Sequence, residues 1–182
     1  MNAKVPLRFD GALRPEWIDF ALTVLPTCET ERHFRSAARQ HLAPQIGGAE
    51  ALTKSVTLLN QLFGFRSPIS RAELHVVAGQ LAALQPGNRA VLRLSVLLRA
   101  SHFVQEVAGI LVRFGAASEA PLPFGDVLIR AERKFGERGS IRRRIKYVLQ
   151  TLRQCGGVAK IGAGWRASDD LAAAAGTLPQ TA

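Results

Sequence analysis

The side chains with the clearest chemistry lie between residues 140 and 155, in the stretch SIRRRIKYVLQTLRQC. It carries five cations and no acidic residue: Arg142, Arg143, Arg144, Lys146 and Arg153. Guanidinium and ammonium groups bind the oxygens of phosphates and carboxylates. A charged helix face is usually only solvated, but such faces mix signs, and cations in the first turns oppose the helix dipole. The pattern therefore favours an external anion over a purely solvated face.

The same stretch has the periodicity of an amphipathic helix. Its apolar residues recur on one stripe, formed by Ile141, Ile145, Val148, Leu149 and Leu152. Ser140 is predicted as the N-cap, and Gly156 with Gly157 as the C-terminal stop. The opposite face then carries Arg143, Lys146, Tyr147, Gln150, Arg153 and Gln154, with Arg142 and Arg144 on its flanks.

The elements around this helix must position it. Upstream we predict a helix over 101–114 ended by Gly115, a short edge strand over 120–124, a helix over 127–135 capped by Asp126, and a tight turn at GERG, residues 136–139. Downstream, residues 158–161 and 164–167 predict two short strands joined at Gly162-Ala163. Residues 89–100, capped by Asn88, are apolar nearly all round, which predicts a central buried helix.

The first half of the chain predicts further helices, after an extended arm over residues 1–13. They span residues 15–25, 29–43, 49–63 and 71–84, the last opened by a capping box of Ser70 and Glu73. The fold class is mainly α, about seven helices in all, with a small β-hairpin. Three regions are predicted: a helical domain at 1–87, a second domain at 88–168 and a flexible tail at 169–182. A single packed unit without a boundary near Pro86-Gly87 is the alternative.

Composition restricts the partners. The chain has 182 residues, 47% of them hydrophobic, and a formal charge of +10, of which residues 126–166 contribute +8. That concentration favours a polyanionic partner. We expect a cytoplasmic protein with reduced thiols, since no signal peptide opens the chain and no apolar run is long enough for a membrane.

Enzyme and metal chemistry have little support. The four histidines are scattered, the two cysteines lack metal-like spacing, and no glycine-rich phosphate loop occurs. A cluster of Cys28, His33 and His41 is the one metal alternative. On the helix over 29–43, an outward stripe of Arg32, Arg35 and Arg39 is either solvated or a secondary phosphate contact. We predict a non-enzymatic protein without a cofactor.

Residues 101–167 thus predict helix, strand, helix, turn, helix, strand, hairpin and strand, an order that resembles the winged helix-turn-helix family. The resemblance implies that residues 140–155 form the recognition helix of a duplex-DNA-binding protein and residues 158–167 its wing. The implied DNA-binding residues are Ser140, Arg142, Arg143, Arg144, Lys146, Tyr147, Gln150, Arg153, Lys160 and Arg166. Arginine forks and Gln150 suit guanine and adenine edges in the major groove, and Arg142 and Arg144 suit the flanking phosphates.

The stretch FGERGSIRRRIKYVLQTLRQCGGV, residues 135–158, also resembles the winged-helix A-component of BREX bacterial phage-defence systems. This resemblance implies DNA binding within an antiviral defence complex and transfers no catalytic residue. The alternative function is a winged-helix protein-interaction or assembly subunit whose cations meet an acidic partner. The apolar helix at 89–100 would offer a surface for a homodimer.

Overall fold

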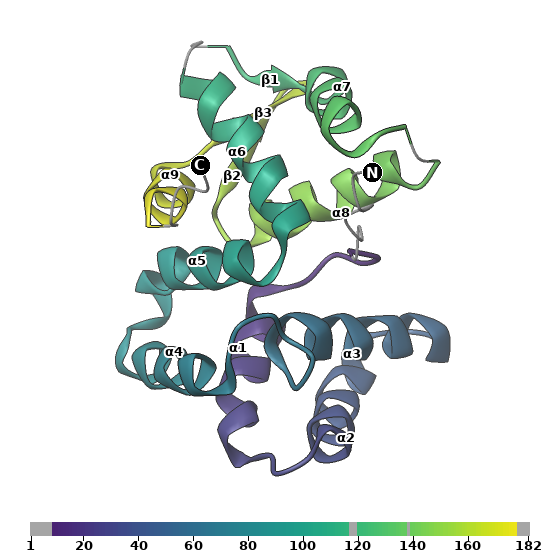
Figure 1. Ribbon diagram of the computed structural model, residues 1–182, viewed down its shortest axis with the longest axis vertical. Helices are drawn as coiled ribbons and strands as arrows, with labels where there is room; N and C mark the ends of the chain where they lie inside the picture. Colours follow the sequence, from purple (N-terminus) through teal and green to yellow (C-terminus); the bar gives the residue numbers. More distant parts are fainter. Residues whose placement is uncertain (1–8, 117–119, 138, 178–182) are drawn as a thin grey trace, which may run out of the picture.

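The computed structural model describes residues 9–116, 120–137 and 139–177, and its helices form two groups on either side of α5 (Figure 1). The helices are α1 (Pro15–Val24), α2 (Glu31–Leu42), α3 (Ala49–Phe63), α4 (Arg71–Ala83), α5 (Ala90–Ala100), α6 (His102–Ala116), α7 (Phe124–Phe135), α8 (Ile141–Gln154) and α9 (Asp169–Gly176). The mainly α fold class is confirmed. The described residues form nine α-helices rather than the predicted seven or so.

A small antiparallel sheet lies beside α6 in the upper group of Figure 1. Its strands are β1 (Leu122–Pro123), β2 (Val158–Ile161) and β3 (Gly164–Ala167), in the order β1-β3-β2. The edge position of β1 suits Pro123, which has no backbone N–H to donate to a second neighbour. The predicted order of elements over residues 101–167 is therefore present, hairpin included.

Helix starts were predicted with mixed success. At α4, Ser70 and Glu73 form both bonds of the predicted capping box. Asp126 was predicted wrongly as an N-cap, because α7 begins at Phe124 directly after Pro123, which places Asp126 within the first turn. Ser140 is the N-cap of α8, but its side chain makes no capping bond, since its backbone is already helical at φ −94° and ψ −10°.

Three other predicted boundaries need correction. Gly115 does not end α6, which continues to Ala116, and the strand predicted over 120–124 is confined to Leu122–Pro123. Asn88 closes a short 3₁₀ turn, Pro86–Asn88, instead of capping the next helix, so α5 begins at Ala90. Each shift is a residue or two, the usual margin at helix and strand ends.

The predicted flexible tail is wrong for residues 169–176, which form α9. The Ser168 side chain accepts a hydrogen bond from the Leu171 backbone N–H, and Asp169 and Asp170 lie in the first turn, where the helix dipole favours negative charge. Leu171 and Ala174 are fully buried in contact with α5 and α6. Their burial stabilises an alanine-rich segment that would be marginal as an isolated helix. Residues 178–182 lie outside the described residues.

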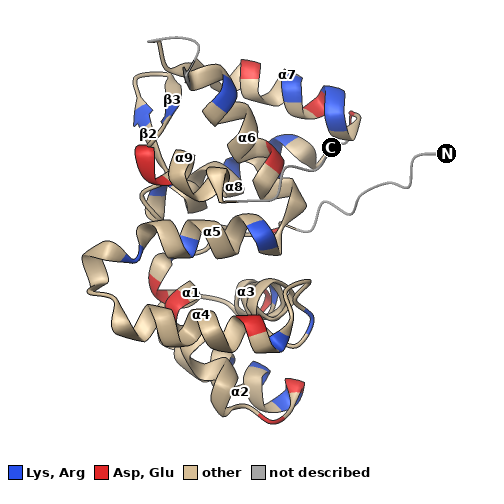
Figure 2. Cartoon of the chain, turned by 60° about the vertical axis from the view of Figure 1, so that its left-hand side comes forward, with Lys and Arg blue, Asp and Glu red and all other residues tan. Residues whose placement is uncertain are grey.

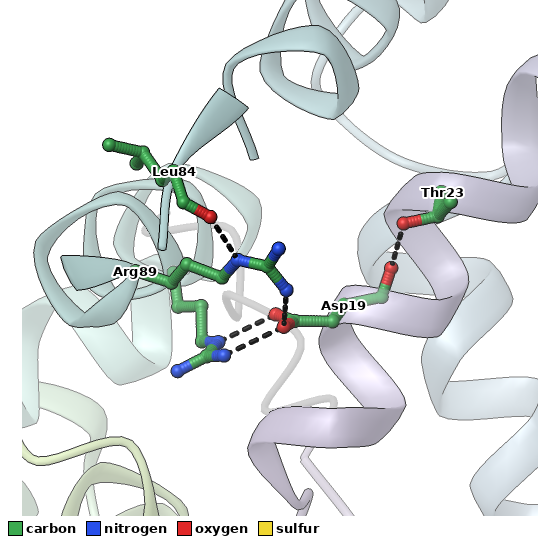
Figure 3. A network of polar contacts seen from close by, with 5 residues as sticks. Asp19, Thr23, Leu84 and Arg89 are labelled. Atoms are coloured by element: carbon green, nitrogen blue, oxygen red, sulfur yellow. Dashed lines mark hydrogen bonds and ion pairs between the residues drawn. The ribbon is translucent and has the colours of Figure 1, made fainter. Parts of the chain in front are cut away.

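The two groups of helices share one hydrophobic core, which includes residues from α1 through α9. A half-buried ion cluster also joins α1 to α5 (Figure 3). The Asp19 carboxylate accepts hydrogen bonds from Arg93 Nε at 2.6 Å, Arg93 Nη2 at 2.7 Å and Arg89 Nη1 at 3.2 Å. Hydrogen bonding to Asp19 raises the pKa of Arg93 above its usual value. This packing favours a single unit over a domain boundary near residue 87.

The segment before α1 also joins the two groups, because it runs from α1 to the side of α8 (Figure 1). Phe9 and Leu13 are fully buried in the common core. The Leu13 backbone N–H donates to the buried Thr151 hydroxyl at 2.8 Å, and Asp10 pairs with Arg144. Residues 9–13 of the predicted extended arm therefore form a packed strap on α8. Residues 1–8 of the predicted arm lie outside the described residues.

The end of α8 has the predicted glycine stop. Gly156, at φ +80°, donates its N–H to the Arg153 carbonyl, and Gly157 donates to the Leu152 carbonyl at 2.7 Å. This pair of bonds is the Schellman arrangement, which fixes the angle between α8 and β2.

A glycine substitution tests that stop. Gly156→Ala is expected to lower the free energy of unfolding by about 1–2 kcal/mol, because alanine disfavours the left-handed conformation. An added Cβ there meets only Ala90 Cβ, at 3.9 Å, so the cost is conformational. As the control, Gly79→Ala within the exposed face of α4 should raise stability by about 0.5–1 kcal/mol. Urea unfolding measures both, and equal effects would contradict the assignment.

Candidate functional site

The apolar face of α8 is buried as predicted. Ile141, Ile145, Val148, Leu149 and Leu152 are each at most 1% exposed. They pack where α8 meets α6, α7 and β2, so the helix is fixed in rotation about its axis. That fixed rotation decides which of its polar side chains reach solvent.

The solvent face of α8 carries six exposed side chains. One is Gln154, and we call the other five the basic strip: Arg142, Arg143, Lys146, Gln150 and Arg153. None of its four cations makes an ion pair with any described residue. Arg142 and Lys146 lie over the ring of Phe124, at 5.7 and 5.9 Å from its centroid. The strip is therefore an exposed row of positive charge without a nearby acidic partner among the described residues.

Two of the predicted site residues, Arg144 and Tyr147, lie on α8 beside the basic strip and not in it. Arg144 is 21% exposed, and its Nε donates to the Asp10 carboxylate at 2.8 Å. Tyr147 is half-buried and packs against the core. The strap of residues 9–13 covers this side through its contacts with Arg144 and Thr151. The charge of Arg144 is thus compensated by Asp10. The prediction that Arg144 lies on a flank of the polar face did not include this partner.

Ser140 is half-exposed at the start of α8, and its carbonyl accepts the Arg144 backbone N–H. On the hairpin, Lys160 and Arg166 are both exposed. Lys160 is paired with Trp165 across the hairpin, whereas Arg166 is paired with Ala159. Because side chains alternate along a strand, Lys160 and Arg166 lie on opposite faces of the sheet. One flat polyanion surface therefore reaches one of them more readily than both.

The chain was compared with protein-family models, curated proteins and solved structures. Nothing matches.

The rest of the molecule offers less chemistry. Lys and Arg occur on both groups of helices, with blue segments on α7, α8 and the β2–β3 hairpin in Figure 2. On α2, Arg35 bonds to Glu31 and Thr57 and Arg39 bonds to Thr53, while Arg32 is exposed. The described helices include none with the length and apolar character to cross a bilayer.

The predicted alternative of a metal site has no geometric support within the described residues, where no three His, Cys, Asp or Glu side chains are close enough to hold an ion. Both cysteines are buried as free thiols. Burial raises the pKa of the Cys155 thiol to about 12, so the nucleophilic thiolate is scarce near neutral pH.

Sequence reasoning missed two residues of this region. Phe124 was assigned to a strand, but it begins α7 and its ring lies beneath two cations of the basic strip. The proline before it was a usable signal, since proline commonly precedes or begins a helix. Asp10, the partner of Arg144, had no local signal, because the two residues are 134 positions apart.

Proposed function

We propose that the chain binds duplex DNA by placing the basic strip of α8 in the major groove. One observation carries the proposal: four exposed cations of one helix face lack an acidic partner among the described residues. Several exposed or half-buried cations elsewhere do pair with an acidic side chain, as Arg99 does with Glu73 and Lys134 with Glu106. An arrangement that leaves like charges uncompensated on one helix face favours a polyanionic ligand.

The dimensions and the chemistry of the strip fit duplex DNA. A major groove about 12 Å wide admits an α-helix. Lys146 and Gln150 lie nearest the middle of the strip, and Arg143 lies on its edge toward Tyr147. Arg143 and Gln150 suit guanine and adenine edges. Arg142 and Arg153 lie on the opposite edge of the strip, where Arg142 contacts Phe124 of α7, and they suit phosphates. Lys160 on the hairpin would contact the phosphate backbone of the DNA, as the wing does in the winged-helix family that this region resembles.

Arg144 and Tyr147 have a different role in this proposal. Arg144 is held by Asp10, and Tyr147 lies toward the strap and α3, so neither belongs to the proposed groove surface. The resemblance to BREX components remains a prediction about the biological setting. An acidic protein partner on the same strip remains the alternative, and the salt and variant experiments separate it from DNA.

Two single substitutions test the proposal against a matched control. Arg142→Gln is expected to weaken binding to all duplexes and to flatten the slope of log affinity against log salt by about one, since one phosphate contact is lost. Arg144→Gln, which removes an equal charge from the same helix, should leave the slope unchanged. Fluorescence anisotropy with a labelled 20-base-pair duplex at several salt concentrations measures both. Equal slopes for the two variants would contradict this placement of the helix.

A further inference from the structure

A cavity of about 700 Å³ lies between α3 and α8. Its walls come from residues 10–12 of the strap, from Trp17 of α1, from residues 46–55 around the start of α3 and from one side of α8. Cavities of about 300–1,000 Å³ are typical of small-molecule sites. The strap crosses between α8 and α3 in Figure 1, so three distant parts of the chain converge there.

The charges in this cavity are mostly compensated. Asp10 pairs with Arg144 at 2.8 Å, and Glu50 pairs with Lys54 at 2.5 Å. The remaining charged residue of the lining is Arg143, which has no ion pair within the described part of the chain. The wall formed by the described residues thus has a net charge of +1, centred on a guanidinium fork that suits a carboxylate or a phosphate.

The uncharged part of the lining suits a ring. Ile46 provides apolar surface and Tyr147 a half-buried aromatic side chain, whereas Trp17 is only 5% exposed and forms a deep part of the wall. Ser55, which carries a hydroxyl as Tyr147 does, also lines the cavity. Apolar and aromatic walls with a few polar groups are the usual composition of small-molecule sites. A compact anion with an aromatic ring meets both the charge and the apolar requirements.

We infer that this cavity binds a small aromatic anion, whose carboxylate or phosphate pairs with Arg143 and whose ring lies against Tyr147 and Ile46, close to the buried Trp17. Nucleotides and aromatic acids share this chemistry. The inference extends the proposed function, because Arg143 belongs both to the cavity wall and to the basic strip. A guanidinium paired with the ligand is withdrawn from DNA, so ligand and duplex should oppose each other's binding reciprocally.

Ligand binding can be measured without DNA. In the full chain carrying Trp165→Phe, Trp17 is the single tryptophan and reports on the cavity wall. Adenosine 5′-monophosphate and 4-hydroxybenzoate distinguish the nucleotide from the aromatic acid, and adenosine and phenol are their neutral controls. We expect saturable changes in Trp17 fluorescence with at least one anion and none with its neutral control. Calorimetry with the wild-type chain provides an independent measure.

Three further substitutions locate the site. Arg143→Gln should weaken the anion at least about tenfold, whereas Arg153→Gln on the same helix, outside the cavity, should leave its affinity unchanged. Ala51→Phe fills the cavity without a change of charge and should abolish anion binding while duplex binding persists. Absence of saturable binding to both anions, or binding indifferent to Arg143→Gln and Ala51→Phe, would overturn the inference.

A duplex titration keeps the two proposals separate. If the wild-type chain binds duplex DNA and neither anion binds, the cavity inference fails and the proposed function stands. If an anion binds through Arg143 and no duplex binds, the proposed function fails and the cavity stands as an independent site. When both bind, saturating anion should weaken the duplex about three- to tenfold, within the usual range of coupling between sites.

Discussion

Asp19→Ala is expected to lower the free energy of unfolding by about 2–4 kcal/mol, because it leaves two half-buried guanidinium groups without their acceptor. Arg93 loses two hydrogen bonds of 2.6 and 2.7 Å, and Arg89 loses one of 3.2 Å. The three side chains are 13–23% exposed, so water compensates only part of the loss. Because the cluster joins α1 to α5, both groups of helices should unfold in one transition at the lower urea concentration.

Lys54→Ala is the matched control. It also removes a short ion pair, with Glu50 at 2.5 Å, but these side chains are 58% and 83% exposed. Exposed pairs contribute little, so its unfolding midpoint should stay close to that of the parent. An Asp19→Ala chain as stable as the control would show that the cluster is solvated in solution. Two separate transitions in the parent would show that the halves are independent domains.

The sequence predicted best what local patterns determine. The apolar stripe of α8 required only the helical period, and the burial of Leu149 and its neighbours follows from it. The capping box at Ser70 and the glycine stop at Gly156 are motifs of a few residues. The hairpin was predictable because two short β-forming runs flank a tight glycine turn. In each case the residues that interact are close in the chain, so their spacing carried the information.

Long-range contacts could not be predicted in the same way. Nothing near Arg144 distinguishes it from Arg143, yet the distant Asp10 compensates one and leaves the other exposed. Thr151 lies among polar and apolar neighbours, and its burial follows from the strap of residues 9–13. The error at α9 has another cause. Residues 169–182 were predicted as a flexible tail, although alanine has the highest helix propensity and Ser168 was a visible N-cap.

The Lys146→Glu, Arg153→Glu double variant is expected to bind duplex DNA at least about 100-fold more weakly than the parent. Both side chains are exposed and neither lines the cavity, so the fold and the cavity should persist. The variant removes two cations from the strip and puts two anions beside the phosphates, which replaces attraction with repulsion. An unchanged thermal melt establishes that the loss is not one of folding.

A second double variant with the same change of charge elsewhere distinguishes the effect of the basic strip on duplex affinity from the effect of the net charge of the protein. Arg32→Glu with Arg39→Glu alters two exposed residues of α2, in the group of helices on the other side of α5 from α8. This control is expected to change duplex affinity less than about threefold, because long-range electrostatic interactions are largely screened at physiological salt. A large loss in the control would instead support the phosphate contact on α2 that the sequence left open.

A salt series of duplex binding by the parent chain and the Lys146→Glu, Arg153→Glu variant tests the central claim most directly. Each phosphate contact contributes a log–log slope of about −0.9. Four cations of the strip and Lys160 therefore predict a slope of about −3 to −5 for the parent and a clearly flatter one for the variant. A parent slope near zero, or a variant that binds as tightly and as steeply as the parent, would contradict the assignment of α8 as the DNA-binding helix.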